Sequence, residues 1–139
     1  MVIVEIEVFP HRDADKVLES KGLLQEVKSI LLSPSKFDHG EIQEMFRLWN
    51  WGLEIYIFQG VTWRWDAYKE KVAVSVELSL IDAVHRDFLR AILAHRHGDL
   101  DVLVYVTSTF KEPKFHNVKR DVEIFEELLD FPILLVGLT

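Results

Sequence analysis

The sequence predicts an α/β fold in which a mixed β-sheet is flanked by helices. Residues 61–79 have the pattern of a β-hairpin, residues 81–96 that of an amphipathic helix, and residues 102–106 form a nearly all-apolar, β-branched strand. A further helix is expected from Pro113 to about Asp130, and a second buried strand over 133–138. Helices that connect apolar strands imply parallel pairing beyond the antiparallel hairpin.

The amino-terminal half is expected to add one strand, three helices and a second strand. Residues 2–9 alternate as a half-buried strand that ends at Pro10, and two short helices fall within 13–31, separated near Gly22. A third helix is predicted over 40–50 and a strand from Gly52 to Phe58. The apolar side chains expected to face the core are Val2, Val4, Ile6 and Val8 in the strand, and Ile42, Met45, Phe46 and Trp49 in the 40–50 helix.

The two later helices have clear apolar faces. The inward positions are Ile81, Val84, Phe88, Ala91, Ile92 and His95 in the first, and Val118, Val122, Phe125, Leu128 and Leu129 in the second. Arg86, Asp87 and Arg90 fall on other faces of the first helix. His95 is expected to pack at the end of its apolar face rather than bind a metal.

The composition favours one globular domain over residues 1–139, because this length allows a sizeable core. The chain has no Cys, which excludes disulfides and Cys-based zinc sites. It shows no apolar run long enough to span a membrane and no secretory signal pattern, so we expect a cytoplasmic protein without membrane contact. A net charge of −7 argues against indiscriminate nucleic-acid binding. It still allows a local basic surface beside an acidic metal site.

A tight turn at Glu70–Lys71 gives the predicted hairpin one apolar and one polar face. A slip by one residue would bury the polar side chains, which favours this register. Glu77 then lies diagonal to Asp66, at about 7–8 Å between Cα atoms. Two carboxylates so placed can bind one Mg²⁺ while the ion keeps several waters. The predicted pairs are Ala67–Val74, Asp66–Ser75, Trp65–Val76 and Trp63–Leu78.

The same polar face also allows a purely structural interpretation. Arg64 lies opposite Glu77 in this register, and the two could form a cross-strand ion pair with Asp66 solvated beside the turn. Acidic pairs are common on exposed hairpin faces. The spacing alone therefore leaves both interpretations open.

Three ordered segments of the chain are similar to a known family. In the first, Asp66 is followed by a short hairpin, by Val76-Glu77 and by a helix that begins soon after. The others are Phe-Pro-Ile-Leu-Leu-Val-Gly-Leu at 131–138 and, after His11, Ala-Asp-Lys-Val-Leu at 14–18. In these features the chain resembles the BglII/BstYI group of type II restriction endonucleases, within the PD-(D/E)XK nuclease superfamily.

The resemblance implies a restriction-endonuclease-like core and a DNA endonuclease that depends on Mg²⁺ or Mn²⁺, usually a homodimer on double-stranded palindromic DNA. By position, Asp66 and Glu77 would be catalytic metal ligands and the backbone carbonyl of Leu78 a further ligand. The implied mechanism is in-line attack on the phosphodiester by a water that the metal activates. Ser79 stands where the wider superfamily has Lys and the BglII group has Gln, and it could orient that water.

Two further residues are auxiliary candidates at this site. Asn50 lies at about the place of an Asn near the family's active site. Glu44 could reach the site from the preceding helix, or it could form a surface salt bridge instead.

A basic stretch and the start of the 81–96 helix are candidates for DNA contact. The stretch follows a predicted strand end, where open α/β sheets often bind ligands, although a solvated loop explains it equally well. Trp63 and Trp65 lie on the predicted core face, so packing is expected there rather than base stacking. The candidate DNA-binding residues are Lys111, Lys114, Lys119 and Arg120 in the stretch, and Asp82, His85 and Arg86 in the helix.

Two other functions stay open at this point. Ser79 and the negative net charge favour a catalytically diverged nuclease-fold protein that binds DNA or a protein partner. The other alternative is an unrelated α/β domain with a structural Arg64–Glu77 pair.

Overall fold

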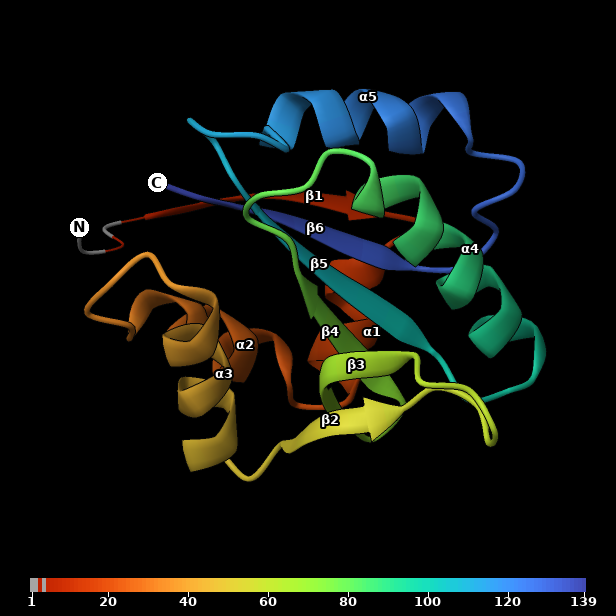
Figure 1. The fold of residues 1–139 in the computed structure, drawn as a ribbon, viewed down its shortest axis with the longest axis horizontal. Helices are drawn as coiled ribbons and strands as arrows, with labels where there is room; N and C mark the ends of the chain where they lie inside the picture. The colour runs from red at the N-terminus through yellow and green to blue at the C-terminus, as the bar shows by residue number, and fades with distance from the viewer. Residues whose placement is uncertain (1–2, 4) are drawn as a thin grey trace.

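The described residues, 3 and 5–139, of this computed structural model form a six-stranded mixed β-sheet with helices on both faces (Figure 1). The strands lie in the order β1-β6-β5-β4-β3-β2. The predicted α/β class is confirmed. The strands are β1 (Ile6–His11), β2 (Gly52–Tyr56), β3 (Arg64–Lys69), β4 (Val72–Val76), β5 (Val102–Ser108) and β6 (Ile133–Leu138).

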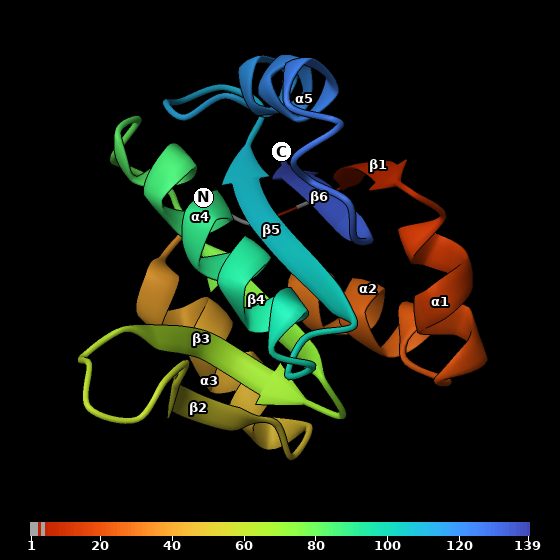
Figure 2. The same ribbon diagram turned by 90° about the vertical axis from the view of Figure 1, so that its right-hand side faces the viewer.

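The direction of strand pairing changes along the sheet, as predicted. The pairs β4–β5 and β5–β6 are parallel, which suits strands joined by crossover helices. The β2–β3–β4 part is antiparallel, and β1 lies antiparallel to β6 at the other edge. Figure 2 shows the β2–β3 pair and β1 at opposite edges of the sheet.

Helices α1 (Ala14–Ser20), α2 (Leu24–Leu32) and α3 (His39–Leu48) cover one face, and α4 (Ala83–Arg96) and α5 (Phe115–Ile124) cover the other (Figure 1). Gly22, with φ +72°, follows α1 in the left-handed conformation that glycine adopts without strain. Asp38 caps α3, because its side chain accepts a hydrogen bond from the Glu41 N–H at 3.0 Å. In the described part of the chain, no helix is both long and apolar enough to cross a bilayer.

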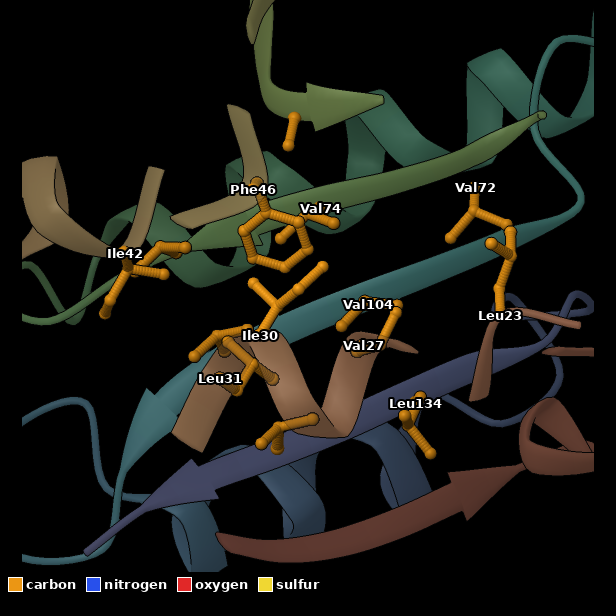
Figure 3. Close-up of a cluster of buried hydrophobic side chains, with 14 of the residues drawn as sticks. Leu23, Val27, Ile30, Leu31, Ile42, Phe46, Val72, Val74, Val104 and Leu134 are labelled. Atoms are coloured by element: carbon orange, nitrogen blue, oxygen red, sulfur yellow. The ribbon is translucent and has the colours of Figure 1, made fainter. Parts of the chain in front are cut away.

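The first core lies between the sheet and α1–α3, and Figure 3 shows its α2 and α3 side chains pointing toward β4 and β5. Ile30 of α2 and Phe46 of α3 are fully buried against Val74 and Val104. The second core joins the other sheet face to α4 and α5. Every residue of β5 is buried, which confirms a strand covered on both sides.

β1 continues through Pro10 to His11, so the prediction that Pro10 ends this strand is wrong. β1 is an edge strand, where the N–H that proline lacks is not needed for the ladder. Val8 is 38% exposed rather than buried. Val2 and Val4 lie outside the described residues.

The last helix is shorter than predicted. α5 ends at Ile124 rather than near Asp130, and a turn follows. Arg12, the residue after β1, stabilises this turn, because it donates hydrogen bonds to the carbonyls of Glu126 and Leu129 at 3.0 and 2.9 Å. Those two carbonyls are therefore bound by a side chain instead of continuing a helical ladder.

Several side chains of the later helices lie elsewhere than predicted. Phe125 and Leu128 are 38% and 55% exposed, because the turn after α5 removes them from the helical face. Ile81 is 58% exposed, since it precedes α4. Asp87, expected on an outer face, is buried instead. His95 packs as predicted, with its ring stacked on Phe131.

Candidate active site

The β3–β4 turn has the form that the sequence predicts. Glu70 and Lys71 both adopt left-handed backbone, with φ +50° and +61°. This is the pattern of a two-residue hairpin turn whose twist matches that of the strands. Ala67 pairs with Val74, as predicted.

The predicted register does not continue beyond Ala67. The β3–β4 pairs of the described chain end at Ala67–Val74, so the predicted pairs Asp66–Ser75, Trp65–Val76 and Trp63–Leu78 are wrong. Trp65 instead pairs with Ile55 of β2. Its ring lies in the second core, whereas Ala67 lies in the first.

A distorted residue on β2 accompanies this change of face. The register places Glu54 opposite Asp66, and Glu54 has a left-handed φ of +53°. Such backbone is strained for a residue other than glycine, and strain of this kind clusters at functional sites. Leu53 of β2 packs against the first core, and Ile57, the residue that follows β2, lies in the second. Both strands therefore change faces at the Glu54–Asp66 position.

The Asp66 carboxylate is fixed by contacts from two elements. Its Oδ2 accepts a hydrogen bond from the Val76 N–H at 2.6 Å, and its Oδ1 accepts one from His39 Nε2 at 3.1 Å. Gln43 donates to the Asp66 main-chain carbonyl at 3.0 Å. The side chain is 21% exposed, so the carboxylate remains open to solvent on one side.

Glu77 follows directly on Val76, the residue that binds Asp66. Its own N–H donates to the carbonyl of Val106 at 2.9 Å, which fixes the backbone of Glu77 to β5. Its Oε1 accepts hydrogen bonds from the N–H groups of Leu80 and Ser79 at 2.8 and 3.2 Å. The hydrogen bond from Val76 therefore links Asp66 to the residue that directly precedes Glu77, at the end of β4.

Charges gather around His39 as well. The hydrogen bond to Asp66 raises the pKa of His39 above 6.5, against the opposing effect of burial. The negative charges of Asp66, Glu54 and Glu77 raise this pKa further. All three carboxylates therefore lie close enough to act on one imidazole.

The structural alternative based on Arg64 is not supported. The described ion pairs do not include Arg64 with Glu77. Arg64 instead donates to the hydroxyl of Tyr56 at 3.1 Å and lies over the Tyr56 ring. Glu77 is thus left free of a guanidinium partner within the described residues.

A buried acid lies between α4 and the central strand β5. Asp87 of α4 accepts a hydrogen bond from the Tyr105 hydroxyl at 2.8 Å. Burial raises the pKa of Asp87, while the Tyr105 hydrogen bond and the Arg86 charge oppose the rise and the Glu77 charge adds to it. Burial likewise raises the pKa of Tyr105, and the charges of Asp87 and Glu77 contribute.

Comparison with known proteins identifies the family. The description of the matching family is restriction endonuclease BglII/BglIII, and the match covers residues 6–138. The chain belongs to the BglII/BglIII restriction endonuclease family.

One solved structure with the same fold is a crystal structure of restriction endonuclease BglII complexed with a DNA 16-mer. The match has a TM-score of 0.85 and 20% sequence identity, and it covers 98% of this chain and 78% of the other. The restriction-endonuclease-like fold is therefore confirmed. No curated protein matches the chain.

In this BglII/BglIII family member, the helical side chains that contact Asp66 are His39 and Gln43 of α3. Sequence reasoning missed both, although their i, i+4 spacing puts them on one helix face. The predicted auxiliary Glu44 instead forms an ion pair with Arg47. Asn50 is exposed just after α3, with φ +68°, and its described contact is the main-chain hydrogen bond to Arg47.

The predicted DNA-binding residues of this family member fall into separate groups. Asp82 and Arg86 line a hollow of about 520 Å³ together with Ser79. Lys111, in the loop after β5, lies over the ring of Phe37.

The remaining candidates lie on α4 and α5. His85 is within 3.2 Å of Asp121 on α5, so it joins these two helices. Lys119 lies over Phe9 of β1, Lys114 is half-buried at the start of α5, and Arg120 is exposed.

Proposed function

We propose that this restriction endonuclease family member is a Mg²⁺- or Mn²⁺-dependent type II DNA endonuclease whose cation is held by Asp66 and Glu77. The observation that carries the proposal is the hydrogen bond from Val76 to Asp66. It joins one predicted acid to the residue that precedes the other. The membership of the family supports cleavage of DNA as the reaction.

The donor set fits a hard divalent cation. Two carboxylates and the Leu78 main-chain carbonyl would offer oxygen ligands only, which Mg²⁺ and Mn²⁺ prefer. Among the described residues, no three His, Cys, Asp or Glu side chains form a group that could hold a metal. Mg²⁺ commonly takes one or two protein carboxylates and keeps several waters, so two acids suffice.

The cation would supply Lewis acidity at the scissile phosphate and a lower pKa for an attacking water. The protein's own contribution is positioning. The Val76 N–H fixes Asp66, and the Leu80 and Ser79 N–H groups fix Glu77. The exposed Ser79 hydroxyl, 3.5 Å from Glu77, is placed to orient a water by a hydrogen bond.

The hollow beside Ser79 is the proposed path of one DNA strand. It is lined by residues 79–83, Arg86 and Glu112, and Arg86 has a side chain that is 51% exposed. A guanidinium in this place can contact phosphate next to the proposed cation site. The solved BglII relative, which was crystallised with a DNA 16-mer, makes double-stranded DNA the partner to test.

We further propose a homodimer joined through the exposed apolar surface of α4 and of the turn after α5. Leu89, Leu93, Phe125 and Leu128 are 64%, 43%, 38% and 55% exposed. A groove of about 180 Å³ between α4 and this turn is lined by Leu89, Phe125 and Leu128. Contiguous exposed apolar surface of this kind marks an interaction site.

Charge supports a second copy of the chain as the occupant of this surface. Arg90 flanks Leu89 and Leu93, whereas three glutamates flank Phe125 and Leu128. A two-fold axis places the same patch of each subunit against its partner. The basic side of one subunit would thereby meet the acidic side of the other. The glutamates are Glu123, Glu126 and Glu127.

Plasmid cleavage with Mg²⁺ or Mn²⁺ tests the proposed activity. Wild-type protein is expected to nick or linearise plasmid DNA, while Asp66→Asn and Glu77→Gln are expected to be inactive but folded. Glu19→Gln, which neutralises an exposed acid of α1, is the matched control and should cleave like wild type. Cleavage that persists in both site variants would refute the proposal.

The residue at position 79 favours a second candidate function. Ser79 replaces the Lys or Gln of the family pattern, and a serine hydroxyl is a poor base at neutral pH. A protein that binds metal and DNA without cleaving it would identify a diverged, non-catalytic DNA-binding member. Electrophoretic mobility shift with the same plasmid fragments distinguishes the two outcomes.

A further inference from the structure

Asp66 lacks the support that a regular strand would give it. The β3–β4 pairs extend from Lys69–Val72 to Ala67–Val74, and Asp66 is the next residue of β3. On its other side it faces the strained backbone of Glu54. Side-chain hydrogen bonds therefore add to the β2–β3 ladder in fixing its position.

Helix α3 provides those hydrogen bonds from two residues that lie one helical turn apart. His39, in the first turn of α3, contacts the Asp66 carboxylate at 3.1 Å. Gln43, one turn later, donates both to the Asp66 carbonyl and to the Glu54 carboxylate, each at 3.0 Å. The Asp38 cap fixes the start of the helix, and this also fixes the backbone of His39, the first residue of α3.

The contact between His39 and Asp66 is of the kind in which one residue hydrogen-bonds a metal ligand without binding the metal itself. His39 Nε2–H occupies one lone pair of Asp66 Oδ1 and leaves another free. The Val76 N–H restrains the other oxygen, so the two donors together determine the rotation of the carboxylate. Partners that orient ligating carboxylates typically contribute about 10- to 100-fold to metal affinity.

We propose that His39 is a positioning residue, which holds the Asp66 carboxylate in the orientation that binds the divalent cation. This inference rests on the proposed function, because it assigns Asp66 as a ligand. It assigns to His39 no contact with the cation itself. An amide nitrogen at the same reach should serve in place of the imidazole, since the hydrogen bond is what matters.

The test is Mn²⁺ affinity, measured by calorimetric titration of the full chain at one fixed pH and ionic strength. The variants are His39→Ala, which removes the donor, and His39→Gln, whose side-chain amide can donate to Asp66. His116→Ala is the matched control, because His116 is an exposed histidine of α5. We expect His39→Ala to weaken binding about 10- to 100-fold, and His39→Gln and His116→Ala to stay near wild type.

The inference is overturned if His39→Ala binds Mn²⁺ as well as or better than wild type, or if His39→Gln is as weak as His39→Ala. The first result would mean that His39 is neutral or competes with the cation. The second would mean that an imidazole rather than a hydrogen bond is required. Asp66→Asn, titrated in parallel, separates this failure from that of the proposed function. If wild type and Asp66→Asn are indistinguishable, the metal site itself is refuted.

Discussion

The Asp66 carboxylate takes the place of a backbone partner for Val76. The Val76 N–H donates to Asp66 Oδ2 at 2.6 Å, at the point where the β3–β4 pairs have ended. Val76 is 5% exposed, so its N–H has little access to water. The Asp66 side chain therefore accepts the hydrogen bond that a strand carbonyl would otherwise accept, and it is also a proposed metal ligand.

The effect of replacing Asp66 on stability should depend on whether the new side chain can still accept the hydrogen bond from the Val76 N–H. Asp66→Ala leaves the Val76 N–H without its partner, whereas Asp66→Asn keeps an oxygen that can accept the hydrogen bond. We expect Asp66→Ala to be less stable than Asp66→Asn by about 1–3 kcal/mol, the cost of a buried unsatisfied donor. Urea unfolding in the absence of metal measures the difference. Equal stability of the two variants would show that this hydrogen bond does not support the fold.

His39 gives the metal-free protein a pH dependence of known sign. Its pKa is raised above 6.5 in the folded state, mainly by the hydrogen bond to Asp66. The stabilisation by His39 is therefore complete below pH 6.5 and is lost as the pH rises through the folded-state pKa.

His39→Gln keeps a donor but removes this titration. Wild type should exceed the variant in stability most at about pH 6, and the difference should shrink by about pH 9. Urea unfolding of both proteins across this range measures it. A difference that grows with pH would contradict the assignment.

Asp87 should destabilise the folded protein at neutral pH. Burial raises its pKa above the ordinary value of 3.8, so the folded state prefers the neutral acid. Its contribution to stability falls as the pH rises from below 3.8 through the folded-state pKa. Asp87→Asn, whose amide oxygen can still accept from Tyr105, should therefore be more stable than wild type at pH 7. The advantage should disappear in acid, and a variant less stable than wild type at pH 7 would refute the argument.

The proposed dimer predicts a specific effect of charge on α4. Leu89→Asp places a carboxylate in the proposed apolar contact and should weaken dimerisation by about tenfold or more. Sedimentation equilibrium over a range of concentrations measures the dissociation constant. Leu32→Asp, at a leucine of α2 that is 42% exposed on the other face of the sheet, is the control. If both variants sediment like wild type, the interface lies elsewhere.

The regular elements could be predicted because their patterns are local. The apolar runs at 102–106 and 133–138 predicted two buried strands, and the break at Gly22 separated two helices. The end of α5 could not be predicted, because a side chain distant in sequence decides it. Arg12 binds two carbonyls of the turn that follows, more than 110 residues further along the chain.

The candidate site was only partly accessible to sequence reasoning. Hairpin spacing brought Asp66 and Glu77 into consideration, and the structure shows Asp66 bonded to Val76, the residue that precedes Glu77. The shared role of the two acids as metal ligands stays a prediction. The change of face at Asp66 was missed, because period-two alternation assumes a regular pleat and Glu54 breaks it. His39 and Gln43 were missed because their role depends on how α3 packs against β3.

The proposed cation site is best tested by a Mn²⁺ titration of wild type, Asp66→Asn and Glu77→Gln, followed by tryptophan fluorescence and by calorimetry. Trp65 adjoins Asp66 in β3, so occupancy of the site should change the emission. Saturable binding is expected in wild type and its loss in both variants, each of which must remain folded. Saturable binding of equal strength in all three proteins would rule out Asp66 and Glu77 as the cation ligands.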